Sequence, residues 1–345
     1  MKFTSPFFIA EISANHQGNF LNAKKLIKSA KKYGANAVKL QTYTPDTMTL
    51  NSDKKYFKIN DGLWRGYKLW DLYNDAKTPY EWHEKLFLYA KKIGITIFSS
   101  PFDEYAVDFL EKLNTPFYKV SSFELTDLPL IKKIALTKKP IIISTGMGTI
   151  GEIEEAYNIA KKYGSTDITL LYCVSNYPSK IEDFNLNNIS ILKKKFKCKV
   201  GLSDHSVDNR VAIAAIALGA EVIEKHIALE GQRGGLDIKF SLRGKQIKKF
   251  RDDIDIAYKL IGKNYFYRNK SEHKNRELRR SIFISKNIQK GEKLTKDNIK
   301  KIRPGNGVHP RYYNSLINKK SPKKLFKGDP LTKNILSLLK IDIKK

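Results

Sequence analysis

The sequence is poor in cysteine. Its 345 residues include only two, Cys173 and Cys198, which are too few for a disulfide framework of the kind that stabilises small secreted domains. Disulfide-free chains are typical of a reducing compartment, and we therefore expect a cytoplasmic protein.

Long hydrophobic runs are missing as well. No apolar stretch reaches the roughly 18 residues that a membrane-spanning helix needs, so we expect no membrane span. The short apolar run in MKFTSPFFIAEIS is interrupted by Glu11, and no small-residue cleavage site follows it. This is not the pattern of a signal peptide.

Acidic residues are scarce relative to basic ones. Lys and Arg total 64 against 35 Asp and Glu, a net charge of +29 that attracts anions. One interpretation is a non-enzymatic protein that binds an acidic polymer; the other is a lysine-rich enzyme with small anionic substrates. The lysines are spread over the whole chain without an RNA- or DNA-binding motif, which favours the second interpretation and no specific nucleic acid. The denser C-terminal third leaves a weak acidic partner open.

What the sequence does contain is a repeated alternation of short β-type runs with amphipathic helical segments. Helical segments such as 22–34 and 152–164 end in glycine, a common helix terminator. Eight strand–helix repeats predict an α/β fold, the (β/α)8 TIM barrel. The β-type runs are residues 7–12, 37–41, 95–100, 117–122, 140–145, 168–173, 199–204 and 221–226.

The remaining segments define the domain organisation. The gap at 43–93 is too long for a βα loop, and we expect an insertion over the barrel mouth. We expect the barrel at residues 1–262, a polar linker at 263–280 and a small second domain at 281–345.

Polar side chains stand at the carboxyl end of every predicted strand, where the active sites of such barrels lie. A lysine inside a normally apolar barrel strand is costly unless it meets an anion. Lys39 and Lys119, with several hydroxyls, therefore predict a phosphate or carboxylate ligand, with a structural ion pair as the alternative. The strand-end residues include Glu11, Lys39, Gln41, Ser100, Lys119, Ser122, Ser144, Ser203, His205, Glu224 and His226.

Two histidines end neighbouring predicted strands. His205 in VGLSDHS and His226 in VIEKHIAL can approach each other, and two imidazoles favour a divalent metal such as Mn, Co or Zn, completed by water and substrate. A hydrogen-bonded histidine pair is the alternative, and the residues alone leave both open. Asp237 follows the last strand and is either a sugar-hydroxyl acceptor or part of a plain loop.

Several motifs together resemble one family, in family order and over almost the whole chain. AEISANHQG, VKLQTYTPDTMTL, FSSPFD, KVSSFELTDLPLI, IIISTGM, GLSDHS and EKHIAL are similar to motifs of the sialic acid (nonulosonic acid) synthases. This resemblance implies condensation of phosphoenolpyruvate with an N-acetylated amino sugar, a C–C bond-forming transferase reaction. RRSIFISKNIQKGEKLTKDNIKKIRPGNGVHPRYY resembles the antifreeze-like (SAF) domain of that family.

Within the family, EISANH, KLQTYTPDTMTL and GLWRGYKLWDLYNDAKTPYEW look most like pseudaminic acid synthases. The implied sugar is 2,4-diacetamido-2,4,6-trideoxy-altropyranose. N-acetylneuraminate and legionaminate synthases are the alternatives, and IALEGQRGGLD departs from the usual family pattern at the sugar side. Synthases of the DAHP or KDO8P type would not explain the SAF segment.

The resemblance also implies roles for individual residues. His205 and His226 match a metal pair, usually holding Mn²⁺, with Mg²⁺ or Co²⁺ possible. Glu11 matches an essential acid and is the candidate for general acid–base catalysis; a metal-bound water that initiates hydration is the alternative. Lys39 and Lys119, which neutralise the phosphate and carboxylate, are the other catalytic candidates. Arg303 matches an arginine that the SAF domain offers to the barrel of the other subunit in a domain-swapped homodimer. Matches to the phosphoenolpyruvate site are Lys39, Gln41, Ser100, Lys119, Ser122, Ser144 and Ser203; Tyr177 and Asp237 match the sugar side, as does Arg303.

Overall fold

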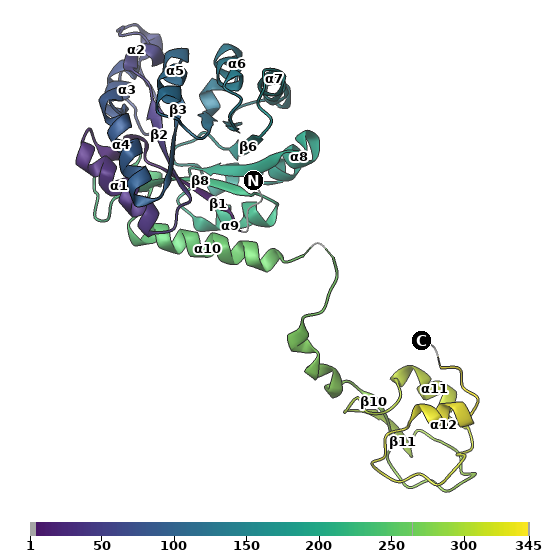
Figure 1. The fold of residues 1–345 in the computed structure, drawn as a ribbon. Coiled ribbons are helices and arrows are strands. Elements are labelled where there is room, and N and C mark those ends of the chain that lie inside the picture. Colours follow the sequence, from purple (N-terminus) through teal and green to yellow (C-terminus); the bar gives the residue numbers. More distant parts are fainter. Residues whose placement is uncertain (1–4, 264, 344–345) are drawn as a thin grey trace. The chain divides into compact units, whose positions relative to one another are not determined.

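The structure is a computed structural model that describes residues 5–263 and 265–343. It divides into two compact units, Met1–Gly262 and Lys263–Lys345 (Figure 1). Each unit has its own cluster of buried apolar side chains.

The first unit is the predicted eight-stranded parallel barrel. Adjacent strands pair in chain order, and β1 also pairs with β8, which closes the ring and sets Glu11 opposite His226. A two-residue strand, β9 (Leu242–Arg243), adds to β8. The barrel strands are β1 (Phe7–Glu11), β2 (Ala37–Thr42), β3 (Thr96–Pro101), β4 (Tyr118–Val120), β5 (Ile141–Ser144), β6 (Ile168–Cys173), β7 (Lys199–Asp204) and β8 (Val222–Ala228).

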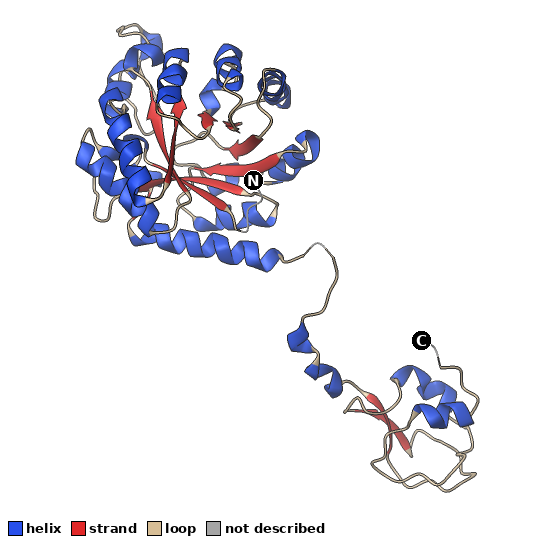
Figure 2. Ribbon diagram, viewed as in Figure 1, coloured by secondary structure: helices blue, strands red, loops and turns tan. Residues whose placement is uncertain are grey.

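Helices surround the barrel (Figure 2). They turn an apolar stripe toward the strands; α1, for example, buries Ala23, Leu26, Ile27 and Ala30, the spacing expected of one helix face. The outer helices are α1 (Phe20–Lys32), α4 (Tyr80–Ile93), α5 (Glu104–Lys112), α6 (Leu128–Leu136), α7 (Ile150–Lys162), α8 (Asn187–Phe196), α9 (Asn209–Ala217) and α10 (Lys245–Ile261).

Strand alternation divides the barrel interior into an apolar and a polar layer. Successive strand residues point to opposite faces. Inward side chains nearer the amino ends, such as Phe98, Ile142 and Leu171, form one apolar cluster. The next inward residues, two positions on, are Ser100, Ser144 and their neighbours, so polar groups gather at the carboxyl ends.

The expected insertion lies between β2 and α4 and lines the cavity at the carboxyl ends of the strands. It contains α2 (Pro45–Met48), the 3-10 helix η2 (Lys55–Phe57) and α3 (Leu69–Ala76). Trp64 Nε1 donates to the carbonyl of Leu236 at 3.1 Å, which ties the insertion to the segment after β8.

The second unit is small and built around an antiparallel strand pair, β10 (Ser281–Ile284) and β11 (Ile299–Ile302). Its core includes Ile282, Leu294 and Leu336. The segment predicted as a linker, 263–280, contains the 3-10 helices η6 (Lys270–Glu272) and η7 (Lys274–Leu278). The remaining elements are η8 (Pro310–Tyr312), α11 (Tyr313–Leu316) and α12 (Lys333–Leu338).

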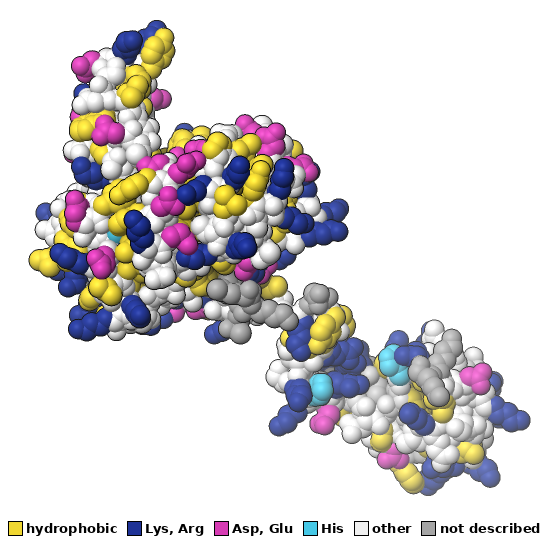
Figure 3. Space-filling model, turned by 45° about the horizontal axis from the view of Figure 1, so that its top comes forward, with side chains coloured by type: hydrophobic (Ala, Val, Ile, Leu, Met, Phe, Trp, Pro, Cys, Tyr) yellow, Lys and Arg dark blue, Asp and Glu magenta, His cyan; other side chains and the backbone are white. Residues whose placement is uncertain are grey.

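Two surface properties bear on the expected partners. No helix among the described residues combines the length and apolarity that crossing a bilayer requires. On the face shown in Figure 3, Lys and Arg side chains are scattered over the barrel unit with Asp and Glu between them.

Candidate active site

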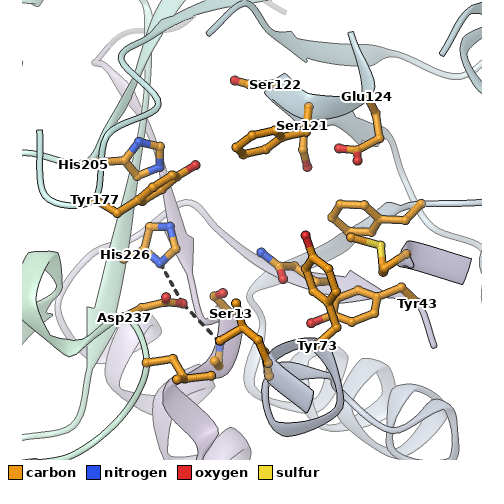
Figure 4. A pocket seen from close by; sticks show the side chains of 18 of the residues that line it. Ser13, Tyr43, Tyr73, Ser121, Ser122, Glu124, Tyr177, His205, His226 and Asp237 are labelled. Atoms are coloured by element: carbon orange, nitrogen blue, oxygen red, sulfur yellow. Dashed lines mark hydrogen bonds and ion pairs between the residues drawn. The ribbon is translucent and has the colours of Figure 1, made fainter. Parts of the chain in front are cut away.

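A cavity of about 460 Å³ opens at the carboxyl ends of the barrel strands (Figure 4). It brings together most of the residues predicted for the site, although they come from all parts of the barrel sequence. The predicted residues that line it are Lys39, Gln41, Lys119, Ser122, Ser144, Tyr177, Ser203, His205, His226 and Asp237.

Lys39 is paired with carboxylates at the floor of this cavity. Its Nζ contacts Glu11 and lies 3.4 Å from Glu224 Oε1, and it donates to Ser100 Oγ at 3.4 Å. Burial acts to lower the pKa of Lys39, but the two carboxylates outweigh burial and raise it. Burial also raises the pKa of Glu11, against the effect of Lys39. Of the two explanations for a lysine inside a barrel strand, a ligand anion or a structural ion pair, Lys39 thus shows the ion pair.

Lys119 differs from Lys39 in its partners. Its Nζ donates to Ser144 Oγ at 2.6 Å and to the carbonyl of Val120 at 2.9 Å. Among the described residues, no carboxylate lies within 4.0 Å of it to form an ion pair. Burial lowers its pKa to about 8. A buried cation that lines a cavity and is not paired with a carboxylate is stabilised when an anionic ligand binds beside it.

The two histidines face each other across the ends of β7 and β8, with ring centroids 5.4 Å apart. His205 Nδ1 lies 3.2 Å from the carbonyl of Val174 and therefore carries a proton when the ring is neutral. His226 Nδ1 lies 3.6 Å from Asp237 Oδ2 and has no hydrogen-bond partner among the residues that the structure describes.

These two imidazoles fit a divalent metal that is held by two protein ligands. In the part of the chain that the structure describes, no group of three or more His, Cys, Asp or Glu side chains gathers around one metal position. Water and substrate would therefore complete the coordination, as in catalytic sites with open positions.

Tyr177 and Asp237 flank the histidines on one side of the cavity (Figure 4). The Tyr177 ring lies 4.4 Å from His205 and 5.4 Å from Trp64, and burial raises its pKa. Burial acts to raise the pKa of Asp237, but contact with His226 outweighs it and lowers the pKa. Asp237 thus stays an anion that can accept hydrogen bonds.

Three predicted site residues do not line the cavity. Glu11 and Ser100 are fully buried behind residues that line the cavity: both contact Lys39, and Glu11 also accepts a hydrogen bond from the backbone N–H of Ser13 at 2.7 Å. Arg303 belongs to the second unit, where it is exposed directly after β11.

The structure adds residues to which the sequence assigned no role. Glu224 lies between Lys39 and Ser203, 3.3 Å from Ser203 Oγ; its position two residues before His226 on one strand was an available signal. Glu124 lines the cavity from η3 (Ser122–Glu124), where strand periodicity gives no signal. Burial raises the pKa of Glu124 to about 7, and its Oε2 finds no hydrogen-bond partner in the described part of the chain.

Comparison with known proteins places these features in a family. Residues 26–265 match the NeuB family, and residues 279–336 match the SAF domain. The chain is 46% identical over 325 residues to a pseudaminic acid synthase of Campylobacter jejuni, covering 94% of this chain and 95% of the relative. It is 37% identical to an N,N'-diacetyllegionaminic acid synthase of the same species, covering 94% and 97%.

A solved structure agrees with this assignment. The N-acetylneuraminic acid (sialic acid) synthetase of Leptospira borgpetersenii serovar Hardjo-bovis is 29% identical and superposes with a TM-score of 0.71 over 79% of this chain and 90% of that one. The barrel, the residues gathered at its mouth and the sequence matches agree, and the chain belongs to the NeuB family and carries a SAF domain.

Proposed function

We propose that the protein is a pseudaminic acid synthase. It condenses phosphoenolpyruvate with 2,4-diacetamido-2,4,6-trideoxy-altropyranose and releases phosphate. The observation that carries this proposal is one cavity lined both by a pair of histidines and by a buried lysine that has no carboxylate partner within residues 5–263 and 265–343. The choice of sugar is supported by the identity of 46% to a pseudaminic acid synthase against 37% to a legionaminic acid synthase.

Phosphoenolpyruvate binds at the floor of the cavity. Lys119 and Lys39 lie on β4 and β2, with the hydroxyls of Ser122, Ser144 and Ser203 beside them. Fixed cations and hydroxyls in a water-poor site neutralise the phosphate and carboxylate and stabilise charge that moves during the reaction.

His205 and His226 would hold a divalent metal, for which we favour Mn²⁺ over Mg²⁺ or Co²⁺. Such a metal would supply Lewis-acid activation of the carbonyl of the open-chain sugar. Tyr177 and Asp237 orient the sugar from the neighbouring wall.

The reaction forms one carbon–carbon bond and breaks one carbon–oxygen bond. C3 of phosphoenolpyruvate attacks the aldehyde carbon, and the aldehyde oxygen takes up a proton to become a hydroxyl. Water adds to C2 and loses a proton, and the C2–O bond to phosphate then breaks, giving a keto acid and inorganic phosphate. Glu124 is placed for these proton transfers because it lines the cavity with a pKa of about 7. Glu11 acts through Lys39, which it contacts.

Phosphate release tests the proposal. The protein, phosphoenolpyruvate and Mn²⁺ are mixed with the altrose sugar, with the legionaminate precursor or with N-acetylmannosamine, each with and without EDTA. We expect EDTA-sensitive release with the altrose sugar above all. Preference for either other sugar would reassign the substrate within the family. No release from any of them, combined with strongly salt-dependent binding to acidic polymers, would support the binding-protein alternative.

A further inference from the structure

Part of the cavity wall is apolar. Four large apolar side chains of the insertion, besides its aromatic residues, line it: Met48, Ile59, Leu69 and Leu72. We refer to these four residues as the apolar roof. All four lie in the segment between β2 and α4, whereas the lysines, serines and histidines of the floor come from the barrel strands and the loops that follow them.

Several contacts hold the roof in place over the cavity. Trp64 Nε1 donates to the carbonyl of Leu236 on the far side of the barrel mouth, at 3.1 Å. Trp70 Nε1 donates to Asp46 Oδ1 at 3.0 Å, which joins α3 to α2. The rings of Tyr43 and Tyr73 meet edge to face at 5.9 Å. These contacts fix the position of the apolar roof, so a bound ligand has to fit against it.

We propose that the apolar roof selects sugars whose end remote from the aldehyde carries methyl groups in place of hydroxyls. This inference rests on the proposed function. With the aldehyde at the histidines and phosphoenolpyruvate at the lysines, the remote carbons of the sugar lie against the remaining wall. The trideoxy sugar presents its C6 methyl and the methyl of its C4 acetamido group there. Tyr43 and Tyr73 also line the cavity and supply polar partners for its amides.

N-acetylmannosamine presents hydroxyls at C4 and C6 instead. A hydroxyl pressed against aliphatic side chains loses its hydrogen bonds to water without replacement. An apolar pocket nevertheless rejects an added hydroxyl by only about 100-fold, so the roof accounts for a preference of that order and not for absolute exclusion.

The test compares Met48→Gln with Leu50→Gln. Glutamine is close to methionine in length, so the change places an amide in the roof without opening a cavity. Leu50 lies two residues further along the same segment, is 66% exposed and does not line the cavity. In both variants and the wild type, kcat/KM is measured for phosphate release with the trideoxy altrose sugar and with N-acetylmannosamine.

We expect the ratio of the two kcat/KM values to fall about tenfold in Met48→Gln and to stay unchanged in Leu50→Gln. Met48→Leu keeps the roof apolar and should keep the wild-type ratio, which separates polarity from shape. If the wild type prefers the trideoxy sugar and Met48→Gln shows the same ratio of kcat/KM values as the wild type, the inference is wrong. The proposed function would still stand in that case. A wild type that prefers N-acetylmannosamine would overturn both.

Discussion

Lys119 Nζ lies 2.6 Å from Ser144 Oγ, while Lys39 Nζ contacts the carboxylate of Glu11. The two lysines occupy the same polar layer, and only Lys39 has carboxylate partners among the described residues. Replacement by methionine should therefore have opposite effects on stability at the two positions.

We expect Lys119→Met to leave the free energy of unfolding unchanged or to raise it, since an uncompensated buried charge is removed. Lys39→Met leaves Glu11 and Glu224 without their cation, and breaking such a buried pair costs about 3–5 kcal/mol. Both variants should release phosphate at a small fraction of the wild-type rate. Urea unfolding measures the difference, and equal destabilisation of the two variants would contradict it.

Phosphoenolpyruvate binding should weaken at alkaline pH. Burial lowers the pKa of Lys119 to about 8, and a lysine is cationic only below its pKa. Affinity should therefore be full below pH 8 and decline above it, by up to about tenfold per pH unit. Calorimetric titration at pH 7 to 9.5 measures this decline. Lys119→Arg, which stays charged, should abolish it, and an equal decline in that variant would assign the effect to another group.

Two buried histidines should make the barrel sensitive to acid. Burial lowers the pKa values of His16 and His83 to about 4. His83 sits between the hydroxyl of Thr42 at 2.8 Å and the carbonyl of Pro79 at 3.1 Å. The unfolded chain binds protons below about pH 6.5 and the folded chain does not. Stability is therefore full above pH 6.5 and falls with pH, by about 2 kcal/mol per histidine at pH 5.

Urea unfolding at pH 7.5 and pH 5 checks this acid sensitivity. His83→Asn should reduce the difference between the two pH values, although its overall stability will be lower. His273→Asn is the matched control because His273 is exposed. A pH dependence that is the same in wild type and His83→Asn would rule the mechanism out for this residue.

Gly146 should be essential for placing Ser122. A Cβ at Gly146 would lie 2.1 Å from Ser175 Oγ and 2.8 Å from Ser122 Oγ, and its amide donates to Ser122 Oγ at 3.1 Å. We expect Gly146→Ala to raise KM for phosphoenolpyruvate about tenfold. Gly151→Ala is the control, because a Cβ there meets only Thr149 Oγ1, at 3.9 Å. Unchanged KM in Gly146→Ala would show that Ser122 tolerates displacement.

The predicted domain-swapped homodimer can be tested by complementation. His226→Ala disables the barrel site and Arg303→Ala disables the predicted contribution of the SAF domain. If Arg303 serves the barrel of the other subunit, a mixed dimer contains one intact site and mixing restores activity. If each chain serves its own barrel, mixing restores nothing. Sedimentation of the mixture confirms that mixed dimers form.

Strand alternation explains why much of the site was predictable. His205 directly follows β7 and His226 lies in β8, and the two strands are parallel neighbours with Asp204 paired to Lys225, so the proximity of the histidines follows once the barrel is recognised. The same alternation explains Lys225, which stands between Glu224 and His226 but points outward, where its Nζ pairs with Asp204 at 2.8 Å. An assignment based on residue type alone, without strand alternation, would have placed Glu224, Lys225 and His226 all in the site.

The sequence by itself determined the strand–helix order, the polar strand ends and the histidine pair, because these depend on local periodicity and on one rule of barrel topology. Only the tertiary structure decided which groups are partners. Closure of β1 on β8 sets Glu11 opposite His226, and Lys39 beside Glu11 and Glu224. The insertion places Met48 and Leu72 in the cavity wall, and η3 adds Glu124. Such contacts join segments far apart in the chain, and a pattern read along the sequence carries no information about which side chains meet across the barrel.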